Sequence, residues 1–214
     1  EISINKMPEN RRTLYFRNIG LKACKDDIRT KVQFKSALED FDLGLYKFIF
    51  QLTFTATMKI LFWSIGKAHE SYVKEGIDLF TKRINHYYTA EWYLLPMPKN
   101  TGMLSESDLK LKEGNMIMEW LKPDDYLVAL DERGKQMKSE ALASFIQARS
   151  NQSVRQLIFL IGGAYGLDEQ VLKRANYKWS LSDLVFPHQL VRLMLAEQIY
   201  RACTILRNEK YHHA

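Results

Sequence analysis

The residue types that could do chemistry gather in three short stretches late in the chain. The first is the turn Gly162-Gly163-Ala164-Tyr165-Gly166, which directly follows the apolar run Gln156–Ile161. The second is the segment Ser180–Val185, and the third is formed by His188 and Arg192. Glycines after a buried strand allow a backbone to come close to a ligand. The turn therefore indicates a ligand site at the end of a strand, although a tight turn without a ligand fits the same residues.

Other signatures of catalysis and of nucleotide binding are missing from the sequence. No G-x-G-x-x-G or G-K-[ST] pattern occurs, which disfavours a dinucleotide site and a P-loop. The segment Ser180–Asp183 and His188 supply the residue types of a hydrolase triad, but no G-x-S-x-G elbow accompanies them. A loop that lines a cleft is the better interpretation of that segment. Because C-x-x-C and H-E-x-x-H patterns are also missing, no metal site is expected.

Composition and charge are those of an ordinary globular chain with a mild basic excess. Of its 214 residues 46% are hydrophobic, and 31 Lys and Arg stand against 25 Asp and Glu. This excess permits binding to RNA but does not demand it, because a solvated surface explains the same charges. The two cysteines, Cys24 and Cys203, cannot build a disulfide framework, which favours a cytoplasmic location. No apolar run is long enough to cross a bilayer, so no membrane partner is expected.

Apolar runs alternate with amphipathic stretches from Met58 onward, as strands alternate with helices in an α/β protein. Strands are predicted at 58–65, 91–95, 126–130 and 156–161, with the segment 178–185 after them. Helices are predicted at 70–87, from Ser105, at 139–149, at 168–175 and from Pro187 onward. The consecutive apolar residues of 156–161 predict burial on both faces, as in a parallel sheet. The predicted fold class is therefore α/β, with a mainly parallel sheet flanked by helices.

Local signals place some of the element boundaries. Ser105, three residues before Asp108, is typical of a capping box at a helix start. Ser139 is likewise expected to cap the helix that it begins. The stretch Asp131–Lys138 is expected to be a polar loop after the strand at 126–130. Together these signals predict about five strand–helix units after residue 57.

Residues 1–57 lack this regular punctuation. They hold 10 basic and 7 acidic residues without a clear period, and the apolar segment Leu43–Phe54 fits a strand or an amphipathic helix. Lys47 and Gln51 within that segment disfavour a secretory signal, and the acidic residues disfavour an organellar transit peptide. We expect residues 58–214 to form the domain and Met58 to be the usual start of translation. The alternative is a genuine accessory arm.

The order of motifs after residue 57 resembles that of one family. The resemblance covers Met58–Ala214, begins with Met58-Lys59-Ile60 as the family does, and says nothing of residues 1–57. It is to the ribosomal RNA large subunit methyltransferase H family, small members of the SPOUT class of trefoil-knotted methyltransferases. The stretches that carry it are Val128–Lys135 (VALDERGK), Phe159–Leu167 (FLIGGAYGL), Trp179–Ser182 (WSLS), Phe186–Arg192 (FPHQLVR), Ala196–Ala202 (AEQIYRA) and Tyr211-His212.

The resemblance implies a fold and a cofactor. The implied fold is α/β, with the C-terminal segment threaded through a loop as a trefoil knot that forms a pocket for S-adenosylmethionine. A glycine at position 162 would let the chain pass the cofactor without a Cβ clash, and backbone groups of 180–185 would bind the adenine edge. Carried over residue by residue, the cofactor site comprises Leu130, Gly162, Ser180, Leu181, Ser182, Asp183, Leu184 and Val185.

The resemblance also implies partners and a reaction. The family is a homodimer in which the partner subunit completes each active site, and it methylates N3 of a pseudouridine in 23S rRNA of the assembled 70S ribosome. The methyl group would move by direct in-line displacement to a nitrogen that must lose its proton. His188 and Arg192 are candidates for polarising the base or holding its phosphate. Tyr211 and His212 are candidates for completing the pocket across the dimer.

Three other interpretations stay open on the residues alone. His188 also fits a helix N-terminal residue that only forms hydrogen bonds. A non-catalytic RNA-binding α/β module fits the basic residues, and measured binding of S-adenosylmethionine would separate it from the enzyme. A Rossmann-type enzyme acting on a small metabolite is disfavoured, because the glycine pattern and the acidic residue expected after the first strand are missing.

If Met58 begins the functional domain, removal of residues 1–57 leaves stability and activity unchanged. We expect the shortened chain and the full chain to unfold at the same temperature and to transfer methyl groups at the same rate, because the predicted core and site lie after residue 57. Calorimetric melting and a methyl-transfer assay on both chains check this. A substantially lower melting temperature, or a loss of activity, would show that the extension is a structural part of the protein.

Overall fold

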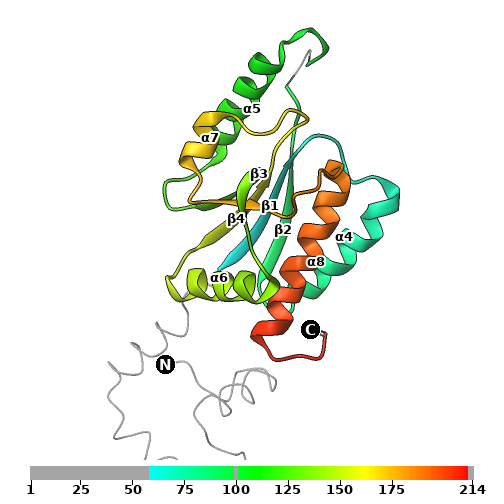
Figure 1. The fold of residues 1–214 in the computed structure, drawn as a ribbon, viewed down its shortest axis with the longest axis vertical. Coiled ribbons are helices and arrows are strands. Elements are labelled where there is room, and N and C mark those ends of the chain that lie inside the picture. Colours follow the sequence, from blue (N-terminus) through cyan, green and yellow to red (C-terminus); the bar gives the residue numbers. More distant parts are fainter. Residues whose placement is uncertain (1–57, 99–100, 212–214) are drawn as a thin grey trace, which may run out of the picture. The chain divides into compact units, whose positions relative to one another are not determined.

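The computed structural model describes residues 58–98 and 101–211, shown as the coloured ribbon in Figure 1. The expectations for residues 1–57 and for His212 lie outside these ranges. In chain order the elements are β1 (Lys59–Ile65), α4 (Ser71–Ile84), β2 (Thr89–Leu95), the 3₁₀ turn η2 (Thr101–Met103), α5 (Glu106–Trp120), β3 (Tyr126–Gln136), α6 (Ser139–Asn151), β4 (Gln156–Ile161), α7 (Glu169–Arg174), β5 (Tyr177–Ser180) and α8 (His188–Leu206).

A five-stranded sheet forms the middle of this part of the chain. The strand order is β2-β1-β4-β3-β5, and every neighbouring pair is parallel. The two central strands pair without a shift, from Lys59 opposite Gln156 to Ser64 opposite Ile161. Parallel strands need a crossover connection between them, which the helices supply. The prediction of an α/β fold with a parallel sheet flanked by helices is confirmed.

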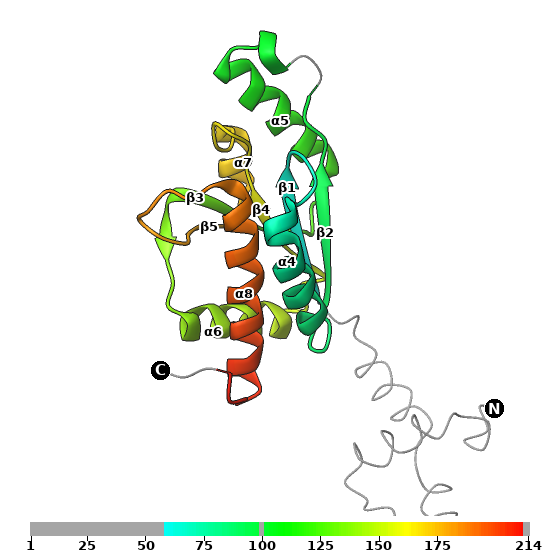
Figure 2. The same cartoon turned by 90° about the vertical axis from the view of Figure 1, so that its right-hand side faces the viewer.

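Helices cover both faces of the sheet (Figure 2). α4, α6 and α8 pack on one face, and α5 and α7 pack on the other. Alternate side chains of β1 serve the two cores, because successive residues of a strand point to opposite faces. Ile60 and Phe62 belong to the first core, and Leu61 and Trp63 to the second. β4 is buried in the same way on both sides, as its apolar run predicted.

β3 differs from the expected short strand at its carboxyl end. Residues 131–136 belong to this strand, where the sequence predicted a polar loop. Trp179 of β5 pairs with Leu130 and again with Lys135, so residues 131–134 leave the ladder between these two points. The polar residues therefore form an excursion within the strand, and they signalled the loss of pairing without showing that pairing resumes.

The two predicted helix caps have different outcomes. The Ser105 side chain accepts a hydrogen bond from the Asp108 N–H over 3.1 Å, so the cap predicted for α5 is confirmed. The prediction that Ser139 caps α6 is wrong. Lys138 is the N-cap residue, without a side-chain cap, and the Ser139 hydroxyl donates instead to Gln198 of α8. Contact with a neighbouring helix has taken the hydroxyl away from the capping position.

Among the described residues, no helix combines the length and the apolar character that a membrane span needs. The trefoil knot implied by the resemblance stays a prediction. The elements that follow β5 nevertheless lie where a pocket needs them, because α8 begins beside the carboxyl ends of β3 and β4 (Figure 1).

We expect Gly134→Ala to destabilise the domain, because a Cβ at this position would lie 2.7 Å from backbone atoms of Trp179. Either β3 or β5 must shift to relieve that contact, which costs about 1–3 kcal/mol of unfolding free energy. Gly102→Ala is the matched control, since a Cβ there meets no atom within 4 Å among the described residues. Urea unfolding of both variants checks the prediction, and equal stability of Gly134→Ala and the unaltered protein would contradict it.

Candidate active site

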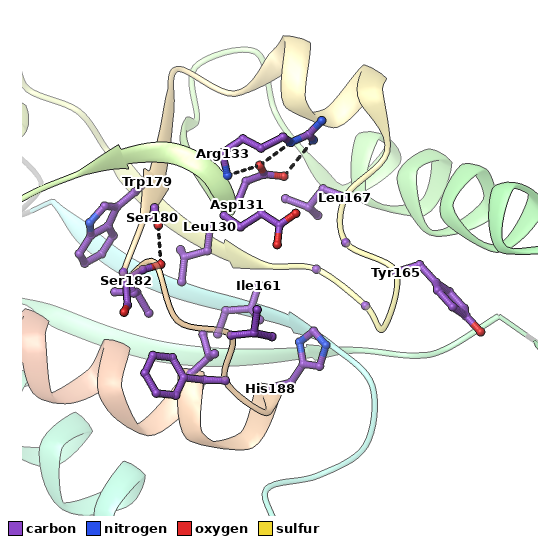
Figure 3. Close-up of a pocket in the computed structure, with 18 of the residues that line it drawn as sticks. Leu130, Asp131, Arg133, Ile161, Tyr165, Leu167, Trp179, Ser180, Ser182 and His188 are labelled. Atoms are coloured by element: carbon purple, nitrogen blue, oxygen red, sulfur yellow. Dashed lines mark hydrogen bonds and ion pairs between the residues drawn. The ribbon is translucent and has the colours of Figure 1, made fainter.

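A pocket of about 790 Å³ lies at the carboxyl ends of β3, β4 and β5. Figure 3 shows Leu130, Ile161 and Ser182 facing the same space, between β3 and the segment that leads to α8. Ligands of open α/β sheets bind at this edge, because the loops that follow the strands meet there. All eight residues that the sequence assigned to a cofactor line this pocket: Leu130, Gly162, Ser180, Leu181, Ser182, Asp183, Leu184 and Val185.

The glycine turn after β4 forms one wall of the pocket. The Gly166 N–H donates to the Gly163 carbonyl over 3.0 Å, and Gly166 has a φ of +83°, which favours glycine. A Cβ at Gly162 would lie 3.0 Å from Gly166 and from the Leu167 side chain. A side chain at position 162 would therefore strike the turn itself. The contact with Gly166 and Leu167 thus explains a glycine at position 162 without a ligand, whereas the sequence analysis explained it by the close approach of a cofactor.

An irregular segment between β5 and α8 forms the opposite wall. The Ser180 hydroxyl donates to the Ser182 carbonyl over 2.9 Å, and the Leu184 N–H donates to Ser182 Oγ over 3.0 Å. Among the described residues, 182–186 take part in none of the backbone–backbone hydrogen bonds that form outside helices and strands. Since backbone N–H and C=O groups need partners, this wall offers donors and acceptors to a ligand. The side chain of Val185 is 87% exposed.

The β3 excursion contributes two acidic residues to the pocket that the sequence analysis missed, Asp131 and Glu132. Arg133 donates from Nε and Nη2 to the two carboxylate oxygens of Asp131, over 3.0 and 3.2 Å (Figure 3). Burial opposes the ionised carboxylate, but the hydrogen bonds and charge of Arg133 outweigh it, so the pKa of Asp131 is lowered. A signal was present: acidic residues directly after a buried parallel strand lie at the binding edge of a sheet.

His188 is the first residue of α8 and lies at the rim of the pocket (Figure 3). His188 is among the exposed residues, but the surrounding protein still removes part of the water from its imidazole. This partial burial, together with the charge of Arg192, lowers the pKa of His188. The same two causes lower the pKa of His69, which follows β1. Both imidazoles are therefore neutral at pH 7, and a neutral imidazole can accept a proton.

Arg192 does not line the pocket and is 2% exposed. Its Nε donates to Ser64 Oγ over 2.9 Å, and its terminal nitrogens donate to the carbonyls of Lys67 and Ile65 over 2.9 and 3.3 Å. These acceptors lie in β1 or directly after it, so Arg192 ties α8 to the sheet. Contact of Arg192 with a base or a phosphate stays a prediction. Its burial argues instead for a structural role.

Tyr211 lies beside the middle of α8, outside the pocket. Its hydroxyl donates to Glu197 Oε1 over 3.1 Å, and Arg201 Nη2 donates to the same oxygen over 2.6 Å. The ring of Tyr211 packs edge-on against Tyr200. The structure therefore does not bring Tyr211 together with His188 within one subunit, and its contribution to the pocket of a partner stays a prediction.

Comparison with known proteins identifies the family. A family described as "Predicted SPOUT methyltransferase" matches residues 58–212. A protein named ribosomal RNA large subunit methyltransferase H, from Cytophaga hutchinsonii, is 47% identical over 156 residues, which cover 73% of this chain and 100% of the relative. The chain belongs to the ribosomal RNA large subunit methyltransferase H family of SPOUT methyltransferases. The resemblance noted from its motifs is confirmed.

Other members of the family are similar over the same part of the chain. The relative from Christiangramia forsetii is 45% identical over 156 residues, covering 73% of this chain and 99% of its own. The relative from Clostridium perfringens is 39% identical over 158 residues, covering 72% and 99%. Two solved structures, a probable methyltransferase from Bordetella pertussis and a probable methylase family protein from Haemophilus influenzae, align at 14% and 12% identity with TM-scores of 0.45 and 0.43. They cover 71% and 72% of this chain and 99% and 69% of their own.

SPOUT methyltransferases take their methyl group from S-adenosylmethionine, and the pocket suits that molecule. Its volume lies in the range of small-molecule sites. The apolar side chains of Leu130, Ile161 and Leu167 can contact a flat ring, and the backbone groups of 182–186 can bind polar ring edges. The carboxylates of the β3 excursion suit a cationic ligand. The residues present therefore fit the cofactor, and no group of His, Cys, Asp and Glu placed to hold a metal occurs in the described ranges.

The two neutral histidines make stability depend on pH. Because the pKa values of His69 and His188 are lowered in the folded protein, the unfolded chain binds protons more readily as the pH falls below about 6.5. The unfolding free energy should therefore fall between about pH 7.5 and about pH 5.5, and this fall should be smaller in a His69→Gln, His188→Gln double variant. Urea titrations at both pH values measure the slope; His86→Gln is the control. An equal slope in the double variant and the control would contradict the assignment.

Proposed function

We propose that this chain transfers the methyl group of S-adenosylmethionine to N3 of a pseudouridine in 23S rRNA, within the assembled ribosome. The observation that carries the proposal is the convergence of the glycine turn and the segment after β5 on one pocket at the carboxyl edge of the sheet. Relatives that this chain covers over 99–100% of their length bear the name ribosomal RNA large subunit methyltransferase H. That name supports a ribosomal RNA substrate.

Different residues of the pocket are suited to different parts of the donor. Bound S-adenosylmethionine supplies a reactive methyl group on a sulfonium. Backbone groups of 182–186 that make no backbone–backbone hydrogen bond would bind its polar edges, and Leu130 and Ile161 would contact its apolar surface. These walls fix the donor in one orientation, and positioning of two reactants can supply much of the acceleration.

His188 is placed to handle the proton that the accepting nitrogen must lose. It lies at the rim of the pocket, where a base presented to the donor would arrive, and its lowered pKa keeps the imidazole neutral at pH 7. A neutral imidazole accepts the N3 proton as the nitrogen forms its bond to the methyl group. Arg192 positions His188 indirectly, because its hydrogen bonds to Ser64 and Ile65 fix the start of α8 to β1.

The modest charge of the domain favours a large, preassembled substrate. Residues 58–214 contain 21 basic and 18 acidic residues, and phosphate contacts supply most of the affinity for free RNA. A homodimer would pool exposed basic residues such as Arg133, Lys135 and Lys210, and the tail with Tyr211 would then complete the pocket of the other subunit. We propose a cytoplasmic location as well, because the proposed substrate is the ribosome.

The proposal is tested by methyl transfer from labelled S-adenosylmethionine to 70S ribosomes that lack the modification. We expect label at N3 of one pseudouridine of 23S rRNA, and far less label when free 23S rRNA is offered. His188→Asn should lower the turnover number by about a hundredfold or more while ribosome binding is kept. His86→Asn is the matched control and should leave turnover unchanged, because His86 is exposed after α4 and does not line the pocket.

Each contrary result would remove a different part of the proposal. Efficient labelling of free 23S rRNA would overturn the requirement for the ribosome. Ribosome binding without any methyl transfer would favour the non-catalytic RNA-binding module. Full turnover in His188→Asn would leave His188 as a residue that only forms hydrogen bonds at the start of α8.

A further inference from the structure

An unpaired carboxyl group lies buried directly behind the glycine turn. Glu113 of α5 is 4% exposed, and its Oε1 lies 2.7 Å from the position of a Cβ on Gly163, so the carboxyl rests against the bare Cα of this glycine. Within the described residues the Glu113 side chain has no hydrogen-bond or ion-pair partner, and its carboxyl oxygens keep some contact with solvent. A glycine at 163 thus permits the approach of an acidic group that no positive side chain of residues 58–98 and 101–211 pairs with.

Such a group is expensive to keep in a folded protein. Burial disfavours the ionised carboxylate and raises the pKa of Glu113. Ionisable groups on the elements around it include Lys110 one turn earlier on α5, Tyr165 in the glycine turn, and Asp168 at the N-cap of α7, which lies against Gly114. Burial alone raises the pKa of Glu113, and none of these three groups contributes to the shift. Buried charges are ordinarily paired or neutralised by a proton, and a cationic ligand in the pocket would favour the ionised form of this carboxyl.

The position of Glu113 joins it to the pocket. Gly163, which it touches, and Lys110, on the same helix, both line the pocket. The carboxyl is therefore separated from the pocket by one glycine backbone. At that range a charge acts across a region of low dielectric, where its effect on a cationic ligand is larger than that of a solvated surface charge.

We propose that Glu113 is a specificity-determining positioning residue, whose carboxylate behind the glycine turn favours the cationic sulfonium donor over the uncharged thioether that remains after methyl transfer. The proposal rests on the proposed function, because it takes S-adenosylmethionine as the ligand of this pocket. Glu113 supplies only a negative charge, and it neither contacts the reacting atoms nor transfers a proton to them. Its consequence is an affinity difference that helps the product to leave.

The test compares two ligands that differ by this charge, S-adenosylmethionine and S-adenosylhomocysteine, by calorimetry on the full chain. Glu113→Gln keeps the shape of the side chain and removes its charge. We expect it to lower the ratio of the two affinities, donor over product, by about tenfold. Glu119→Gln removes the same charge from an exposed site on the same helix, and Glu132→Gln removes an exposed charge at the pocket. Both should change the ratio less.

The pH dependence of the same ratio gives a second measurement. Because the pKa of Glu113 is raised, the carboxylate forms only as the pH climbs above its usual range. In the unaltered protein the ratio should rise with pH through that titration and then level off, whereas in Glu113→Gln it should be flat. The amino-acid end common to both ligands cancels in the ratio.

Several outcomes would overturn the inference. They are an unchanged ratio in Glu113→Gln, an equal loss of affinity for both ligands, and a ratio that falls only in Glu132→Gln. An equal loss would mean that Glu113 merely shapes the turn. If Glu113→Gln does not fold, a pH-independent ratio in the unaltered protein still overturns it. Failure of the unaltered protein to bind either ligand would instead contradict the proposed function.

Discussion

Arg192 is buried where α8 meets the carboxyl end of β1, and no carboxylate pairs with it among the described residues. Withdrawing a guanidinium from water costs several kcal/mol unless other acceptors replace the water. The Ser64 hydroxyl and the carbonyls of Ile65 and Lys67 replace it here. Since Ser64 and Ile65 belong to the central strand β1 and Lys67 follows it directly, the start of α8 is fixed to the centre of the sheet. The pocket wall that leads into α8 depends on this contact in turn.

The same guanidinium shapes the electrostatics of the site. Burial lowers the pKa of both His69 and His188, and the positive charge of Arg192, which has no counter-ion among the described residues, lowers both further. Across the pocket, the β3 excursion presents the carboxylates of Asp131 and Glu132. One side of the pocket therefore carries a neutral imidazole, and the other carries an Asp131–Arg133 ion pair beside the exposed carboxylate of Glu132. That division suits a cationic donor beside a group that gives up a proton.

The sequence could predict the strands, because parallel strands that are buried on both faces consist of continuous apolar runs, as in Gln156–Ile161. It placed the end of β3 too early, because polar residues signal a break in pairing and cannot show that Lys135 pairs again. The cofactor residues came from the resemblance, since backbone groups do the binding and leave no side-chain pattern. The burial of Arg192 and of Glu113 left no sequence signal, because both depend on partners or spaces that only the folded chain brings together.

Trp179 pairs with both Leu130 and Lys135, and this separates the length of β3 from the register of the sheet, two properties that are usually linked. In most strands an inserted residue shifts every later side chain to the other face of the sheet. Here residues 131–134 lie outside the ladder and pairing resumes at Lys135, so a residue inserted among 131–133 need not change which residue Lys135 pairs with. Lengthening such a loop costs little conformational entropy. Natural selection can therefore remodel one wall of the pocket by insertion or deletion, as an independent module, while the sheet keeps its register.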